Sequence, residues 1–243
     1  MNKRLILIAL IITGLLTTVS PALSEEYVLG TFPIPLMVID ENNGVFVELA
    51  KEIAKKAGVS LSIQVAPPMR TVNNFQEGKV HGIFPALDVS FPDLSKIERS
   101  DSIYIKKDFA FTLKGAQMLK SIADLEGKKV GITRGYPYVR ELTENKNIKL
   151  DLADSDETNA KKLNGKRIDC FVVEETTGLQ AFKNVGLIDY FLFFRGSPIS
   201  TQDVYFAFGN DDTGKMLAKK LSDAMNALKA DGTFGNIMAK AQQ

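Results

Sequence analysis

Residues 47–65 read VELAKEIAKKAGVSLSIQV, which predicts a helix followed directly by a strand. One face of the predicted helix carries Val47, Ala50, Ile53, Ala54 and Ala57. Gly58 is placed to end that helix in a left-handed cap, a conformation that glycine adopts without steric cost. Residues 61–65 then alternate apolar and polar side chains, as a strand with one buried face does.

The same alternation of strand and helix continues along most of the chain. Further strands are expected at residues 27–31, 80–84, 129–133, 148–152, 168–173, 190–194 and 204–208. Further helices are expected at residues 71–77, from Pro137 to about 145, from a cap at Ser155 or Asp156 to Gly165, at 174–183, and along a stripe from Leu217 to Leu228. This order predicts an α/β fold with parallel sheets that helices cover on both faces.

The first 24 residues have the pattern of a secretory signal peptide. A basic start at residues 2–4 precedes an apolar run at 5–16 and a small, polar stretch that ends near Ser24, where cleavage is expected. The alternative is a membrane anchor, but the run is shorter than the about 20 residues that span a bilayer. No cysteine follows it, which argues against a lipid anchor. A mature protein of 219 residues in the periplasm is therefore expected.

Composition narrows the function classes. Without Lys3 and Arg4, 28 basic side chains stand against 29 acidic ones, a net charge of −1. Nucleic-acid partners usually require a clustered basic excess, so none is expected. Cys170 is the only cysteine and cannot form an internal disulfide; its place in an apolar run favours a buried small hydrophobe over a reactive thiol. We expect a monomer without cofactor or metal.

Five short stretches, in order and spacing, carry a family resemblance. They are GVFVELA at 44–50, GKV at 78–80, SIADLEGKKVG at 121–131, RID at 167–169 and ALKADGTF at 227–234. Together they resemble the extracellular solute-binding proteins of family 3, typified by binders of polar amino acids. The resemblance implies a type II periplasmic binding fold. It also implies one lobe of residues 25–111 and 205–243, a second lobe of 112–204, and hinge segments near 109–113 and 203–206.

Candidate binding residues follow the predicted strands, because ligands of open α/β sheets bind at the carboxyl ends of the strands. Phe32 is either a cleft wall or a core residue. Arg70 is either a bidentate carboxylate clamp or a surface residue. Asp88 either accepts a bond from a ligand or caps a loop. Tyr136 stands at an expected helix N-terminus, where N–H groups favour anions.

Glu174 follows the strand at 168–173. By the resemblance, it aligns with the acidic residue that receives the amino group of a ligand; the alternative is a carboxylate that only complements a helix dipole. Two carboxylate contacts of the family are absent, since Asp93 stands where an arginine is expected and Tyr136-Pro137 where Ser or Thr is expected. Either Arg70 replaces the clamp, or the ligand is not a simple α-amino acid.

Three functions remain open at this point. The leading hypothesis is a periplasmic solute-binding protein for an ABC importer, with a permease in the inner membrane as partner. A sensor subunit for a membrane receptor would have the same fold and site. A dehydratase-like enzyme on this scaffold would need an acid or base in the cleft, and His81, the only histidine, lies early in a strand. No zinc-protease, nucleophile-elbow or phosphate-loop motif is present.

Overall fold

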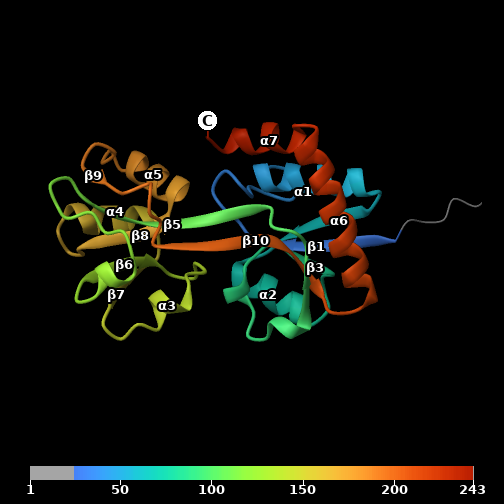
Figure 1. Ribbon diagram of the computed structural model, residues 1–243, viewed down its shortest axis with the longest axis horizontal. Coiled ribbons are helices and arrows are strands. Elements are labelled where there is room, and N and C mark those ends of the chain that lie inside the picture. Colours follow the sequence, from blue (N-terminus) through green and yellow to red (C-terminus); the bar gives the residue numbers. More distant parts are fainter. Residues whose placement is uncertain (1–24, 243) are drawn as a thin grey trace, which may run out of the picture.

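The computed structural model describes residues 25–242, so the predicted signal peptide of residues 1–24 lies outside the described part of the chain. Two lobes share one curled mixed sheet, in the strand order β2-β1-β3-β10-β5-β8-β6-β7 (Figure 1). Lobe I holds β1 (Glu26–Thr31), α1 (Val45–Ala57), β2 (Ser60–Val65), α2 (Pro68–Gln76), β3 (Gly82–Ala86), β4 (Ile97–Arg99), α6 (Asp212–Ala230) and α7 (Thr233–Met238). Lobe II holds β6 (Lys129–Thr133), α3 (Arg140–Thr143), β7 (Lys149–Ala153), α4 (Asp156–Asn164), β8 (Cys170–Glu174), α5 (Glu175–Asn184) and β9 (Phe191–Leu192).

Two long strands, β5 (Tyr104–Leu113) and β10 (Ser200–Gly209), run from one lobe to the other (Figure 1). They pair with each other in antiparallel register from Ser200 opposite Asp108 to Val204 opposite Tyr104. β10 continues into lobe I beside β3, and β5 continues into lobe II beside β8. The two-lobed architecture is thus confirmed; the predicted lobe boundaries at 111/112 and 204/205 fall inside these strands and stay a prediction.

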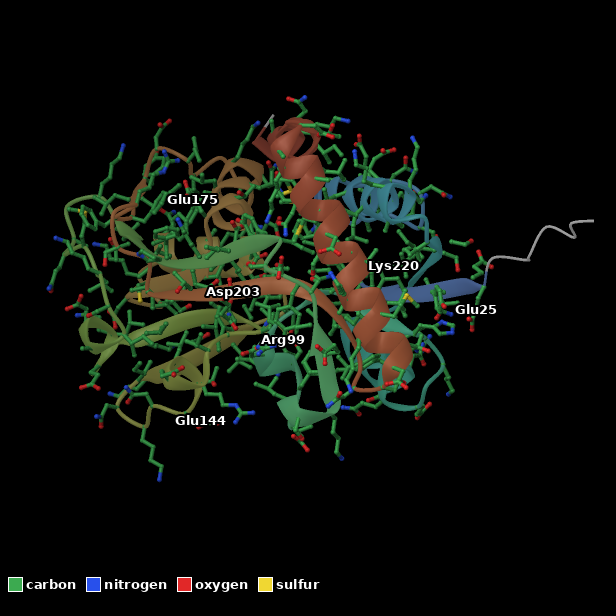
Figure 2. All side chains as sticks on the ribbon, turned by 45° about the vertical axis from the view of Figure 1, so that its right-hand side comes forward. Glu25, Arg99, Glu144, Glu175, Asp203 and Lys220 are labelled. Carbon is green, nitrogen blue, oxygen red and sulfur yellow. The ribbon has the colours of Figure 1, made fainter. Side chains whose placement is uncertain are left out.

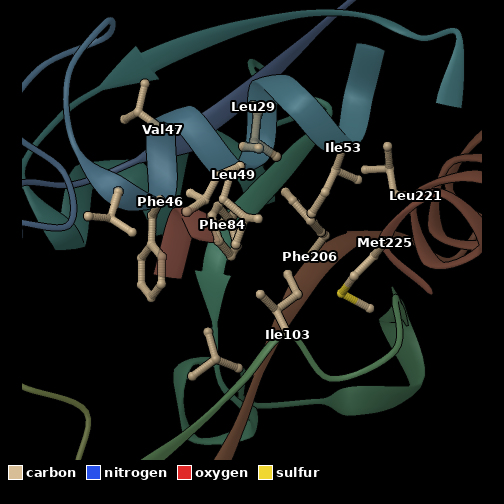
Figure 3. Close-up of a cluster of buried hydrophobic side chains, with 14 of the residues drawn as sticks. Leu29, Phe46, Val47, Leu49, Ile53, Phe84, Ile103, Phe206, Leu221 and Met225 are labelled. Atoms are coloured by element: carbon tan, nitrogen blue, oxygen red, sulfur yellow. The ribbon is translucent and has the colours of Figure 1, made fainter. Parts of the chain in front are cut away.

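The core of lobe I forms where α1 packs on the sheet. Phe46, Leu49 and Ile53 of α1 are buried, and the cap N–H of the left-handed Gly58 bonds to carbonyls of the last turn, as the sequence predicts. Figure 3 shows these side chains against Phe84 and Phe206, whose rings stack at 4.3 Å. Each such buried ring contributes about 1.5–3 kcal/mol relative to an exposed one.

Helices cover both faces of each half of the sheet (Figure 1). In lobe I, α1, α6 and α7 lie on one face and α2 on the other; in lobe II, α4 and α5 oppose α3. Cys170 is fully buried on β8, which confirms the expected small buried side chain, and burial raises the pKa of its thiol to about 12. No helix among residues 25–242 is long and apolar enough to cross a bilayer.

Two predicted elements were wrong in detail, and one strand was missed. No helix begins at Pro137: α3 starts at Arg140, because the buried Tyr138 holds the preceding segment extended. The hydroxyl of Tyr138 accepts the N–H of Thr133 and donates to the carbonyl of Val172, both at 3.0 Å. The expected strand at 190–194 shrinks to the two residues of β9, and β5 was not predicted at all.

Candidate functional site

A cavity of about 150 Å³ lies between the two lobes. One water molecule needs ~10–15 Å³, so the cavity has room for a small molecule. We call it the main cavity. Its wall is mostly apolar. From lobe I it is lined by Phe32, Pro33, Ile34, Pro35, Leu36, Met37, Phe46, Pro68, Pro85 and Leu87; from the crossing strands by Tyr104, Lys106 and Val204; and from lobe II by Tyr136, Pro137, Glu174, Thr176, Thr177 and Gln180. Such a concave apolar site with few polar groups is typical of small-molecule binding.

Glu174 is the carboxylate of the main cavity, at the end of β8. Its Oε1 accepts a bond from the hydroxyl of Tyr104 at 3.0 Å. Its Oε2 accepts the N–H and the hydroxyl of Thr177, at 2.9 and 3.1 Å, so Glu174 caps α5. Burial, and then the nearby carboxylate, raises the pKa of Tyr104, which keeps its hydroxyl a donor at physiological pH. The position of Glu174 at the N-terminus of α5 is thus confirmed, and its role in binding stays a prediction.

Lys106 is the second charged side chain of the wall. It forms an ion pair with Asp108, which is fully buried and also accepts a bond from the Ser200 hydroxyl at 2.9 Å. Asp108 lies directly opposite Glu174 in the β5–β8 register, so both carboxylates face the same side of the sheet. The ammonium group of Lys106 pairs with Asp108, and no ion pair joins it to Glu174.

Tyr136 reaches the main cavity from the loop after β6. Its hydroxyl donates to Asp156 at 2.7 Å, and the Thr133 hydroxyl donates to the other oxygen of that carboxylate. Burial raises the pKa of Asp156 despite these two bonds. The Tyr136 ring is thereby held at the cavity wall, but not at a helix N-terminus, because α3 begins four residues later; the predicted N–H anion site is wrong.

The structure brings together three of the five predicted site residues. Phe32, Tyr136 and Glu174 all line the main cavity. Arg70 does not: α2 already begins at Pro68, so Arg70 falls in its first turn with an exposed side chain. The predicted carboxylate clamp is therefore not assembled at this cavity.

Asp88 lines a different hollow, the second groove. Its Oδ1 lies 2.7 Å from Arg99 and accepts the Tyr205 hydroxyl at 2.6 Å. Arg99 and Asp203 both line this groove, and Figure 2 shows them near the middle of the molecule, where β10 passes between the lobes. Asp93, at the position where the family arginine was expected, caps a short 3-10 turn by accepting the N–H of Ser95.

Sequence reasoning missed the contribution of β5. Tyr104 and Lys106 line the main cavity, yet the charged run of residues 106–108 hid the strand that carries them. His81 does not line this cavity; its Nδ1 accepts the N–H of Val28 at 2.8 Å.

A two-lobed α/β fold with a cavity at the crossing strands invites comparison with known proteins. The family model described as bacterial extracellular solute-binding proteins, family 3, matches residues 29–242. The chain belongs to this family. The L-cystine-binding protein TcyJ of Escherichia coli (strain K12) is 28% identical to this family 3 protein over 229 residues, which cover 87% of this chain and 79% of TcyJ.

Two further comparisons agree. The histidine-binding periplasmic protein of Salmonella typhimurium is 23% identical over 207 residues, covering 81% of this chain and 78% of that protein. The GluR0 ligand-binding core from Nostoc punctiforme in complex with (L)-glutamate superposes with a TM-score of 0.71 at 21% identity, covering 88% of this chain and 98% of the other. That structural likeness shows the fold alone, whereas the relatives are named as binding proteins rather than enzymes.

Proposed function

We propose that this protein captures a small polar solute, an amino acid or a related compound, in the periplasm and delivers it to an ABC-type importer. The main cavity carries this proposal. It lies between the two lobes, beside the strands that connect them, and its mostly apolar wall carries one partly buried carboxylate, Glu174. Closure of the lobes around a solute at this place would bury the solute and change the outer shape that a membrane partner meets.

The names of two relatives support a chemical class for the solute. TcyJ is named as an L-cystine-binding protein and the Salmonella typhimurium relative as a histidine-binding periplasmic protein. Both names support a small solute with an amino group, which Glu174 would receive. The second name also supports export to the periplasm, in line with the signal-peptide pattern of residues 1–24.

A thermal-shift screen of the purified mature protein tests the binding role. The panel holds amino acids, amines, small organic acids and short peptides. A solute at 100 times its Kd adds about 2.7 kcal/mol to the free energy of unfolding. We expect at least one clear stabiliser; a folded, ligand-free sample that no compound stabilises contradicts the proposal.

Two further measurements separate delivery from sensing and from catalysis. If the protein serves an importer, deletion of its gene abolishes cellular accumulation of the radiolabelled stabiliser. Unchanged accumulation favours a membrane receptor as partner. If the protein only binds, mass spectrometry recovers the stabiliser chemically unchanged after incubation, whereas dehydrated product favours an enzyme.

A further inference from the structure

The charges around the main cavity do not balance. Lys106 is the only cationic residue of its wall. Its ammonium group pairs with the fully buried Asp108, whose strand position faces Glu174. No lysine, arginine or histidine of the described residues forms an ion pair with Glu174, whose three hydrogen-bond donors are all uncharged. One negative charge of the cavity therefore has no counter-ion within the protein.

If Lys106 left Asp108 to bind a ligand, the protein would lose stability. Only 12% of its side chain is exposed, and Asp108 has the Ser200 hydroxyl as its one other side-chain donor. A buried carboxylate that loses its cation is strongly destabilising. Lys106 therefore stays paired with Asp108. Its ammonium group also lies 5.4 Å from the centroid of the Tyr138 ring, which attracts it further.

Glu174 keeps acceptor capacity toward the cavity. A carboxylate offers about four lone-pair positions, and three are used by Tyr104 and Thr177. The aromatic rings of the wall belong to Phe32, Phe46, Tyr104 and Tyr136. Aromatic faces attract cations, and their effect adds to that of a neighbouring carboxylate. This wall suits an ammonium group.

The same wall has no place for a carboxylate. Arg70 lies outside it, and Glu174 itself occupies the N-terminus of α5, where an anion would otherwise bind. The remaining polar side chains are Thr176, Thr177 and Gln180, none of them charged. An α-amino acid carries its ammonium and carboxylate groups on the same carbon, so if Glu174 receives the ammonium group, the carboxylate lies close to the uncompensated Glu174, and like charges repel there.

We propose that the solute is an organic amine: an ammonium cation on an apolar body, without a carboxylate. This inference rests on the proposed function, since it names the class of solute that the main cavity takes. Glu174 receives the ammonium group, the rings of Tyr104 and Tyr136 flank it, and the lobe I wall around Phe32 and Phe46 receives the apolar body. L-cystine and histidine, which the relatives are named as binding, differ from such an amine because they carry a carboxylate.

Isothermal titration with matched pairs tests the inference on the ligand-free mature protein. Each pair is an amino acid and the amine that lacks only its carboxylate: L-phenylalanine and 2-phenylethylamine, L-leucine and 3-methylbutylamine, L-lysine and cadaverine. We expect at least one amine to bind, and to bind about tenfold or more tightly than its amino acid. An amino acid that binds as tightly as its amine overturns the inference, as does a panel in which no amine binds. The proposed function fails only if the wider solute screen is negative too.

Two variants at neighbouring positions test whether Glu174 is the residue that binds the amine. Glu174→Gln removes the charge while an amide oxygen can still accept the Tyr104 hydroxyl, so the Kd of the amine should rise by about tenfold or more. Glu175→Gln removes the same charge from a side chain that pairs with Arg195 at 2.7 Å and does not line the cavity. This control should bind as the parent does. Equal affinities for the amine in Glu174→Gln and the parent overturn the assignment, provided that both unfold alike.

Discussion

The Tyr104 hydroxyl donates a hydrogen bond to Glu174 at 3.0 Å, and this bond joins the first residue of β5 to the last residue of β8. It therefore ties a crossing strand to the lobe II side of the main cavity. The bond holds the one carboxylate of that wall in a fixed orientation.

Tyr104→Phe removes this bond and little else. Because Tyr104 is partly buried and its acceptor keeps two other donors, we expect the free energy of unfolding to fall by about 1 kcal/mol. Urea unfolding of the mature protein measures it. Tyr190→Phe is the matched control: Tyr190 is 58% exposed, and its variant should differ from the parent by less than about 0.5 kcal/mol. Equal losses in the two variants would show that the Tyr104 bond contributes nothing specific.

The Lys106–Asp108 ion pair predicts a strong asymmetry between single and double substitution. Lys106→Met leaves Asp108 buried without a cation, and we expect a loss of roughly 3–5 kcal/mol. Lys106→Met with Asp108→Leu removes both charges and should be less destabilising than Lys106→Met alone. Lys219→Met breaks the exposed pair with Asp223 and should cost at most about 0.5 kcal/mol. A Lys106→Met loss as small as that of Lys219→Met argues against a buried pair.

Asp156 predicts a pH dependence of stability. Burial raises its pKa in the folded state above the ordinary value of 3.8, so the folded protein binds this proton more tightly than the unfolded chain does. Ionisation therefore lowers stability as pH rises from about 3.8 through the folded pKa, by about 1.4 kcal/mol per pKa unit of difference. Asp156→Asn lacks this loss. We expect the stability of the variant relative to the parent to rise between pH 4 and 7 in urea unfolding; a difference that stays constant with pH contradicts the raised pKa.

Gly44 fixes the loop that carries part of the cavity wall. Its φ of +126° lies in the region that favours glycine, and a Cβ atom there would stand 2.3 Å from the carbonyl oxygen of Met37. Gly44→Ala should therefore lower the free energy of unfolding by roughly 1–3 kcal/mol. Gly235→Ala, in α7 with open space around the new Cβ, should be neutral or slightly stabilising. If both variants unfold alike, the close approach at Gly44 is not present in solution.

The sequence predicts the fold well where local signals and burial agree. The apolar face of α1 and its Gly58 cap gave that helix nearly its observed bounds, and Ser155 caps α4 as expected. Prediction failed where tertiary contacts override the local pattern. The charged residues 106–108 do not predict a partly buried strand, because only the folded structure brings Lys106 and Asp108 into an ion pair. Likewise, Pro137 does not start a helix, because the burial of Tyr138 holds this segment extended.

The candidate site shows the same division. Glu174, Phe32 and Tyr136 follow strands whose ends the sequence locates, and they line the main cavity. Arg70 was expected there because it follows a predicted strand, but the early start of α2 at Pro68 turns it outward. Tyr104 could not be found, because it approaches the cavity from a crossing strand that no local pattern revealed.

Hydrogen–deuterium exchange with the best stabiliser of the solute screen tests most directly whether the main cavity, rather than another hollow, holds the solute. At a saturating concentration, we expect protection of residues 32–37, 104–106, 136–137 and 174–180, which line the main cavity or lie within its wall. Protection confined to the second groove around Asp88 and Arg99, or to the lobe I hollow lined by His81 and Asp93, would contradict the account.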